Sequence, residues 1–221
     1  MMETIKIPYC QLYKFEFADL EYSDNLLEKW KDSLEWMPGK TEKQSCIGYR
    51  GKRSDLNPYD EVLFTWFKKC LDICSLEILG NTYLDICDSW LTRTKFGQSS
   101  LDHFHSYSIL SGVYYFNDSK TAIEFTIDNI VADSLTKLFP PMGESVLNRI
   151  QINPTRGTLL IFPSSIFHKI QTNKFVGKSR FSLAWNSFLN GVISDKQTRY
   201  LNIKLETVAE RYYRDKKNNG S

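Results

Sequence analysis

Residues 103–116 read HFHSYSILSGVYYF, and this stretch decides the fold. It opens with two of the chain's three histidines, His103 and His105, and the third is His168. Side chains two positions apart project from the same face of a strand, so the two rings point the same way if the segment is extended. Imidazole is the commonest protein ligand for transition metals. A close pair with one distant histidine therefore predicts a single metal site.

The surroundings of His168 indicate a side chain that faces inward. Ile166 and Ile170 share its face in an extended segment. Lys169 and Gln171 occupy the other face. A buried imidazole without a partner costs about 1–3 kcal/mol. His168 therefore needs a hydrogen bond within the core or a metal ion, and the histidines alone leave both interpretations open.

A second polar pair follows along the chain, at Arg180 and Ser182. The two residues share one face of an expected strand. A guanidinium can bind a carboxylate through two parallel hydrogen bonds, and a neighbouring hydroxyl can add a third. If this face lies inside a barrel with the histidines, the pair predicts a site for an anionic small molecule. A surface ion pair is the alternative interpretation of Arg180.

The hydrophobic pattern changes from helical to strand-like along the chain, which predicts an α+β fold built around a β-sandwich or barrel. Helices are expected over 23–37 and 59–79, and strands over 83–92, 107–117, 121–128, 146–152, 157–162, 165–172 and 179–188. A last strand is expected over 198–205, and the chain is expected to fray from residue 214. We expect a single domain over 1–221, with a helical part at about 1–80, a β core at about 83–190 and a C-terminal extension at about 191–221.

Composition and charge narrow the class of protein. The 221 residues are 42% hydrophobic and 24% charged, and the formal net charge of +2 predicts neither nucleic acid nor membrane as a partner. Five cysteines without a CxxC pair indicate reduced thiols and a cytoplasmic location. Cys70 and Cys74 are one helical turn apart and could share a metal, but core packing is the stronger expectation. No apolar run reaches the roughly 18–20 residues of a membrane span, and no signal-peptide core follows Met1.

Three stretches, read in order, resemble a family of Fe(II)/2-oxoglutarate oxygenases found in bacteria and tailed phages. Residues 103–116 resemble the family's metal-binding strand, residues 157–164 the strand that leads to His168, and residues 180–186 the late strand with its basic residue. Upstream, residues 87–90 (Cys-Asp-Ser-Trp) are similar to the family's tryptophan-containing strand. The resemblance covers about residues 85–190.

This resemblance implies a double-stranded β-helix, the cupin-like jelly roll, supported by N-terminal helices. It implies that His103, His105 and His168 hold Fe(II), with no catalytic residue beyond these ligands. The co-substrate 2-oxoglutarate would chelate the iron and place its far carboxylate against Arg180, with Ser182 beside it. Oxidative decarboxylation of 2-oxoglutarate to succinate and CO2 would drive hydroxylation of a C–H bond.

Aromatic residues of the same region have two interpretations. Tyr107, Tyr114 and Tyr115 either line the site, where Tyr115 would bind the 2-oxoglutarate chain, or pack in the core. Trp90 and Trp185 are expected in the core.

One position departs from the family pattern. These oxygenases commonly use two histidines and one carboxylate, with the motif His-x-Asp/Glu, and His105 stands at the acidic position. Asp102 points away from the histidine face of an extended strand, and Asp118 is expected to shape a turn. Glu124, on the next strand, is the stronger rival, either as a substitute ligand or as a support for one.

Two other functions fit the same residues. A three-histidine cupin can act without 2-oxoglutarate, as a dioxygenase or an isomerase. A non-catalytic jelly-roll binding module, such as a phage accessory protein, would use the histidines structurally. The loops 40–58, 93–101 and 129–145 are expected to frame the mouth of the site. The sequence leaves three classes of prime substrate open: a protein side chain, a nucleotide or a small metabolite. It gives no oligomeric state.

Overall fold

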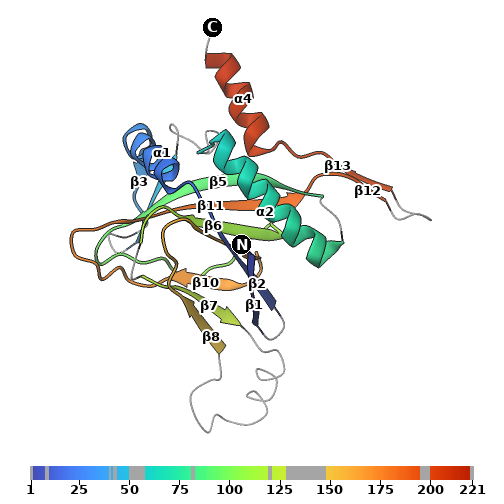
Figure 1. Cartoon of the computed structure of the whole chain (residues 1–221). Helices are drawn as coiled ribbons and strands as arrows, with labels where there is room; N and C mark the ends of the chain where they lie inside the picture. The colour runs from blue at the N-terminus through green and yellow to red at the C-terminus, as the bar shows by residue number, and fades with distance from the viewer. Residues whose placement is uncertain are drawn as a thin grey trace, which may run out of the picture.

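Two antiparallel sheets form the centre of the molecule (Figure 1). The computed structural model describes residues 2–7, 10–39, 41, 44–49, 58–80, 83–118, 121–127, 148–194 and 200–219. The large sheet has the order β1-β2-β9-β6-β11-β5-β4-β3. Its strands are β1 (Met2–Ile7), β2 (Cys10–Glu16), β3 (Glu35–Met37), β4 (Cys46–Tyr49), β5 (Leu84–Thr94), β6 (Leu110–Tyr115), β9 (Thr158–Pro163) and β11 (Arg180–Leu189). The small sheet has the order β10-β7-β8, with β7 (Ile123–Ile127), β8 (Asn148–Ile152) and β10 (Phe167–Ile170).

Two helices cover the face of the large sheet that is turned away from the small one (Figure 1). The helix α1 (Leu20–Ser33) begins after Asp19, whose carboxylate accepts a hydrogen bond from the Tyr22 amide. The helix α2 (Glu61–Leu79) begins after Asp60 and ends at Gly80, which has a φ of 69°. Their apolar faces pack on the large sheet through residues such as Trp30 and Phe67. Among the described residues, no helix has the length and apolar character needed to cross a bilayer.

A second hydrophobic core lies between the two sheets. The large sheet contributes Leu12, Val113, Tyr115, Leu160 and Phe162, and the small sheet contributes Ile123 and Phe125. The strand β2 is therefore buried on both faces, because Leu12 points to this core and Tyr13 points to the helices. The same arrangement leaves space between the sheets at one end for a pocket.

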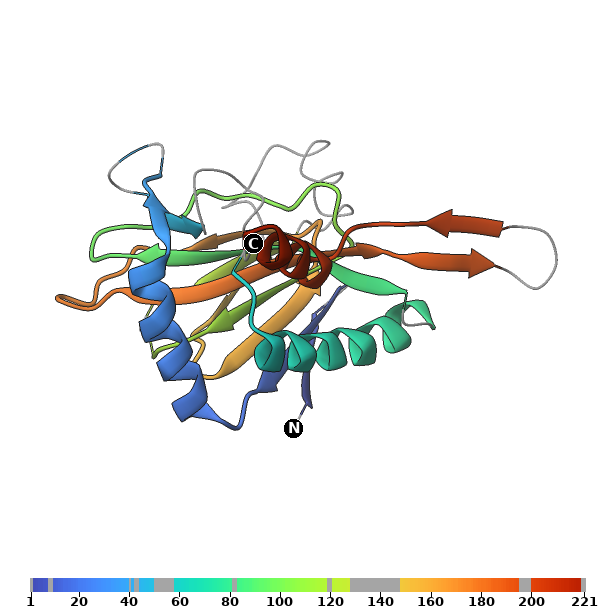
Figure 2. The same ribbon diagram turned by 90° about the horizontal axis from the view of Figure 1, so that it is seen from above.

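A hairpin and a helix complete the chain. The hairpin β12 (Gly191–Ser194) and β13 (Tyr200–Ile203) projects from the body of the molecule (Figure 2). The helix α4 (Val208–Asn219) follows, and its start is capped by Thr207 and Glu210, whose side chains bond each other and the backbone.

The structure confirms the α+β class and every expected helix and strand from residue 59 onward. It corrects the description of residues 1–80 as a helical part, because β1, β2, β3 and β4 all belong to the large sheet. It also corrects the frayed end, because α4 extends to Asn219. The first helix begins at Leu20 rather than at residue 23. The expected loop 129–145 and most of 40–58 lie outside the described residues.

Gly112 on β6 lies directly against Trp185 on β11. A Cβ atom added there would lie 2.1 Å from Cζ2 of Trp185, which is fully buried. We expect Gly112→Ala to lower the free energy of unfolding by about 1–3 kcal/mol, because the core cannot expand without cost. Urea denaturation measures this loss. In a Trp185→Leu background the same substitution should cost much less, and an equal cost in both backgrounds would contradict the steric explanation.

Candidate metal and co-substrate site

The three histidines converge on one point between the sheets. One ring nitrogen from each of His103, His105 and His168 lies within 4.8 Å of the others. His168 comes from β10, and the other two come from the segment between β5 and β6. The backbones of His103 and His168 pair as an isolated antiparallel bridge, with N–O distances of 3.0 and 2.9 Å. This bridge holds the segment with His103 and His105 next to His168.

The histidine pair does not lie on a regular strand. The expected strand over 107–117 begins only at Leu110, and Tyr107 adopts a φ of 57° with 94% of its surface exposed. The left-handed turn at Tyr107 separates the histidines from β6, so side-chain alternation does not continue across it. Tyr107 therefore does not line the site. Tyr114 also lies elsewhere, because its hydroxyl bonds Ser23 in the helix-side core.

Each histidine is held through Nδ1, which leaves Nε2 for a metal. Nδ1 lies 2.8 Å from the Leu101 carbonyl in His103 and 2.9 Å from the Ile166 carbonyl in His168. A carbonyl oxygen only accepts hydrogen bonds, so Nδ1 carries the proton and Nε2 carries the lone pair. Metal-binding histidines in proteins commonly show this arrangement, in which an oxygen acceptor fixes the tautomer.

Burial keeps the two inner imidazoles neutral. It lowers the pKa of His105 to about 4, where a hydrogen bond to Asn186 acts in the opposite direction. Burial and the neighbouring His103 lower the pKa of His168 to about 3. Neutral imidazole is the form that binds a metal. Both rings are therefore in the ligand form at neutral pH without a metal to displace their protons.

Arg180 is buried in the same pocket, and no acidic side chain of the described segments pairs with its charge. Its side chain is 1% exposed, and among the described residues no group forms a hydrogen bond with Nε, Nη1 or Nη2. Burial lowers the pKa of Arg180, but a guanidinium remains protonated in proteins. An unpaired buried charge is strongly unfavourable. The arrangement therefore provides a strong site for an anion.

Ser182 and Tyr115 flank Arg180 in different ways. Ser182 shares the pocket face of β11 with Arg180 and is 2% exposed. Tyr115 places its ring 4.6 Å from the Arg180 guanidinium carbon, and its hydroxyl has no hydrogen-bond partner among the described residues. It contacts Arg180 from the core but is not among the residues that line the pocket.

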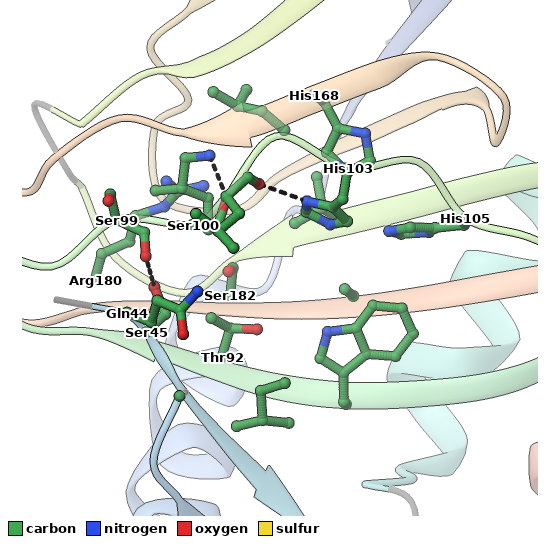
Figure 3. Close-up of a pocket in the computed structure, with 18 of the residues that line it drawn as sticks. Gln44, Ser45, Thr92, Ser99, Ser100, His103, His105, His168, Arg180 and Ser182 are labelled. Atoms are coloured by element: carbon green, nitrogen blue, oxygen red, sulfur yellow. Dashed lines mark hydrogen bonds between the residues drawn. The ribbon is translucent and has the colours of Figure 1, made fainter. Parts of the chain in front are cut away.

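A pocket of about 300 Å³ joins the histidines to Arg180 (Figure 3). Arg180 lies at one end with hydroxyl and amide groups, and the histidines lie toward the other end. The polar lining around Arg180 consists of Gln44, Ser45, Thr92, Ser99, Ser100 and Ser182. The apolar lining includes Trp90, Ile123, Phe162 and Ile170. Among the described residues, no aspartate or glutamate lines this pocket.

Two further sequence expectations concern this lining. Segments 40–58 and 93–101 do contribute to the pocket, through residues such as Gln44 and Ser99. The expectation that Trp90 lies in the core is wrong, because its ring lines the pocket with its centroid 5.4 Å from that of His105. Trp185 is fully buried in the core, as expected.

The acidic rivals of His105 lie away from the three ring nitrogens. Glu124 pairs with Lys169 across β7 and β10, one position from His168 and hence on the opposite face. Burial acts to raise the pKa of Glu124, but hydrogen bonds from Lys169, Gln171 and Gln151 hold it below its usual range. Its carboxylate therefore serves an ion-pair network.

The remaining alternatives have simpler roles. Asp102 is exposed, and Asp118 accepts a hydrogen bond from the Arg156 amide in a turn. Cys70 and Cys74 are buried in the helix-side core, where burial raises the pKa of the Cys70 thiol to about 12. Within the described part of the chain, the three histidines are the only group of side chains placed to share a metal.

The sequence interpretation missed one polar group at the site, Asn186. Its Oδ1 lies 2.6 Å from Nδ1 of His105 and accepts a hydrogen bond from the Ser111 hydroxyl. The signal was present, because Asn186 continues the alternation that begins at Arg180 and Ser182 on β11.

The lowered histidine pKa values predict acid sensitivity of the metal-free protein. The pKa of His168 is about 3 in the native state against 6.5 for an ordinary histidine. Below pH 6.5 the unfolded chain binds a proton that the native protein does not, so stability falls as pH falls from 6.5 toward 3. At pH about 4.5 the loss from His168 is about 3 kcal/mol.

Urea denaturation of chelator-treated protein at neutral pH and at the acidic pH tests this loss. The His168→Phe variant lacks the titrating group and should lose correspondingly less stability, whereas the carboxylates contribute equally to both proteins. Equal acid losses in the two proteins would contradict the assignment.

Comparison with solved structures identifies the fold. The chain aligns with a prolyl-4-hydroxylase of Pseudomonas putida at 15% identity and a TM-score of 0.52, over 79% of this chain and 91% of the other. It aligns with the alpha-ketoglutarate-dependent carbocyclase SnoK of nogalamycin biosynthesis at 12% identity and a TM-score of 0.56, over 80% and 78%. The epimerase SnoN, solved with Fe3+ and alpha ketoglutarate, aligns at 9% identity and a TM-score of 0.56, over 89% and 90%. The expected double-stranded β-helix is therefore confirmed.

Sequence comparison gives a family match over part of the chain. No curated protein sequence matches the chain. Residues 88–186 match the family described as "Putative 2OG-Fe(II) oxygenase". This segment contains the three histidines, Arg180 and Ser182. The part of the chain from residue 88 to residue 186 is therefore similar to the 2OG-Fe(II) oxygenase family.

Proposed function

We propose that this protein is an Fe(II)- and 2-oxoglutarate-dependent hydroxylase whose metal ligands are His103, His105 and His168. One observation supports this more than any other. Three imidazoles and a buried guanidinium share a single pocket, and within the described part of the chain the guanidinium nitrogens have no hydrogen-bond partner. A metal and a carboxylate satisfy the two groups together, and 2-oxoglutarate carries a metal-chelating end and a distal carboxylate.

The charge of the pocket fits a dianionic co-substrate. Imidazole is a neutral metal ligand, Arg180 is positive, and no acidic side chain among the described residues lines the pocket. Fe(II) would add two further positive charges. The two carboxylates of 2-oxoglutarate would balance them, as a metal-bound Asp or Glu side chain partly does in sites with two histidines and one carboxylate. His105 in place of an acid is therefore compatible with co-substrate binding.

The residues of the pocket have distinct tasks in this proposal. Bound iron supplies the site at which the oxidative decarboxylation of 2-oxoglutarate is coupled to hydroxylation of a C–H bond. The histidines fix the position of the metal, and Arg180 with Ser182 orients the co-substrate through its distal carboxylate. The apolar wall that includes Trp90 and Phe162 limits the access of water to the reacting groups.

The size of the pocket limits what the prime substrate can insert. About 300 Å³ must hold the co-substrate and the reacting group together, and this volume is at the small end for ligand sites. We therefore propose that only a group of side-chain size enters, whether it belongs to a protein, a nucleotide or a small metabolite. The free thiols of Cys46, Cys70, Cys74 and Cys87 support a reducing, cytoplasmic environment for the reaction.

Succinate formation tests the reaction class. Purified protein with Fe(II), ascorbate, oxygen and 2-oxoglutarate should form succinate slowly without prime substrate, in step with oxygen consumption. Chelation of iron should stop this turnover. Oxygen consumption that requires iron but yields no succinate would favour the three-histidine cupin without 2-oxoglutarate, and failure to bind iron would favour a non-catalytic binding module.

A further inference from the structure

The strand β11 presents a continuous row of side chains to the site. Arg180, Ser182 and Ala184 line the pocket at alternate positions, and Asn186 is the next residue on that face. The pairing of β11 with β5 shifts register immediately after Asn186. Such irregularities alter the direction of side chains beside binding sites. The row therefore ends in an amide placed beside His105.

Asn186 contacts His105 at the nitrogen that does not face the metal position. Its Oδ1 lies 2.6 Å from Nδ1 of His105 and 2.9 Å from the Ser111 hydroxyl, which donates to it. Ser111 Oγ itself lies 2.8 Å from the same His105 nitrogen. His105 is the proposed ligand whose Nδ1 contacts side chains, whereas the Nδ1 atoms of His103 and His168 lie against backbone carbonyls.

A chain of hydroxyl groups fixes the orientation of the amide. Ser111 Oγ lies 2.7 Å from Ser164 Oγ, and Ser164 donates to Ser108 at 2.7 Å. Ser108 in turn donates to the backbone carbonyls of Leu110 and Ser187. The single proton of the Ser111 hydroxyl points to Asn186 Oδ1, so the amide presents its accepting oxygen on this side. This arrangement favours Oδ1 of Asn186, rather than its NH2 group, facing the imidazole.

The orientation of the amide decides whether His105 can bind a metal through Nε2. With Oδ1 as the neighbour, Nδ1 carries the proton and the lone pair is on Nε2. With the amide reversed, its NH2 group would donate to Nδ1, and the proton of a neutral ring would move to Nε2. The second arrangement blocks the lone pair that a metal needs.

We propose that Asn186 is a positioning residue, which fixes the tautomer and direction of His105 for metal binding. This inference rests on the proposed function, because it takes His105 as an iron ligand. A neutral amide also differs from the carboxylate that often supports a metal-bound histidine, because it orients the ring without adding negative charge. The positive charge of the loaded site is then left for the co-substrate to balance.

Three variants test the inference. Asn186→Ala removes the acceptor and should weaken Fe(II) binding by about 10–100-fold, the usual effect of losing an outer partner of a ligand. Asn186→Asp is nearly isosteric, keeps an acceptor and should bind Fe(II) at least as tightly as the wild type. Ser187→Ala is the matched control, because Ser187 is fully buried on the same strand and its hydroxyl donates to the Leu110 carbonyl rather than to the His105 side chain. Anaerobic calorimetry with Fe(II) measures all three.

A spectroscopic measurement separates positioning from a loss of stability. Nitrogen-15 NMR of metal-free protein should show His105 as the Nδ1–H tautomer in the wild type and in Asn186→Asp. In Asn186→Ala the ring should show a mixture of tautomers, a change that Ser187→Ala should not cause. Wild-type tautomer and affinity in Asn186→Ala would overturn the inference, as would an equal loss of affinity in Asn186→Asp.

The proposed function and this inference can fail separately. If the wild-type protein binds no Fe(II), the proposed function is wrong, and with it the role of His105 as a ligand. The tautomer measurement would then still decide whether Asn186 fixes the ring. If the wild type binds Fe(II) and Asn186→Ala binds it equally well, only the positioning role is wrong.

Discussion

His168→Phe is expected to abolish iron binding while the protein remains folded. The imidazole of His168 lies among aromatic rings, with centroids 4.8 Å from Phe162 and 5.9 Å from Phe125. A phenyl group fills much the same space but offers no lone pair, so the site keeps two of its three ligands. We expect the affinity for Fe(II) to fall by more than about 100-fold. This loss exceeds the usual effect of removing a residue that only hydrogen-bonds to a metal ligand. Succinate formation should disappear with it.

Folding controls make this result decisive. Circular dichroism and urea denaturation at neutral pH should show wild-type structure and stability, because the buried polar group has been replaced by an apolar one. Phe167→Ala is a matched control on the neighbouring, outward-facing position of β10, where 39% of the side chain is exposed. That variant should bind iron normally. Stoichiometric iron in His168→Phe would contradict the three-histidine site.

Arg180→Met is expected to separate iron binding from co-substrate binding. Loss of a charge-assisted pair of hydrogen bonds to a carboxylate should weaken 2-oxoglutarate by about 3 kcal/mol or more, which is about 100-fold or more in affinity. Fe(II) affinity should stay within a few-fold of the wild type, because Arg180 contacts none of the histidines. Calorimetric titration of the metal-free variant with Fe(II) measures the first affinity. Calorimetric titration of the iron-loaded variant with 2-oxoglutarate measures the second.

The same substitution should make the metal-free protein more stable. Arg180 is buried without an ion-pair or hydrogen-bond partner among the described residues, so an apolar chain of similar length removes an unfavourable charge. We expect the free energy of unfolding to rise by about 1–4 kcal/mol. Binding of 2-oxoglutarate should stabilise the wild type and not the variant. Unchanged 2-oxoglutarate affinity in Arg180→Met would contradict its role as the anchor.

Most of the fold could be predicted from the sequence because the central strands are rich in β-branched and aromatic residues and are separated by turn residues. The strands β5 to β11 lie within a few residues of the expected ranges. The strand β2 was missed because Leu12 and Tyr13 are both fully buried, one on each face, which removes the alternation of apolar and polar residues. The short strands β3 and β4 carry too few residues for any periodicity to show.

The candidate site was predictable to the extent that rare residue types mark it. The three histidines and Arg180 could be placed together by strand alternation and by the family resemblance. The turn at Tyr107 and the bridge between His103 and His168 could not, since both depend on contacts between distant segments. The roles of Trp90 and Asn186 were hidden for the same reason, because nothing local distinguishes a pocket-facing side chain from one in the core.

Anaerobic titration of the apo-protein with Fe(II), and then with 2-oxoglutarate, tests the central claim most directly. The account predicts binding of one iron per chain, followed by a visible charge-transfer band when 2-oxoglutarate chelates the metal. His168→Phe should show neither event, and Arg180→Met should bind iron and need far more 2-oxoglutarate to develop the band. Iron binding without any band at saturating 2-oxoglutarate would contradict the account, as would wild-type protein that binds no iron.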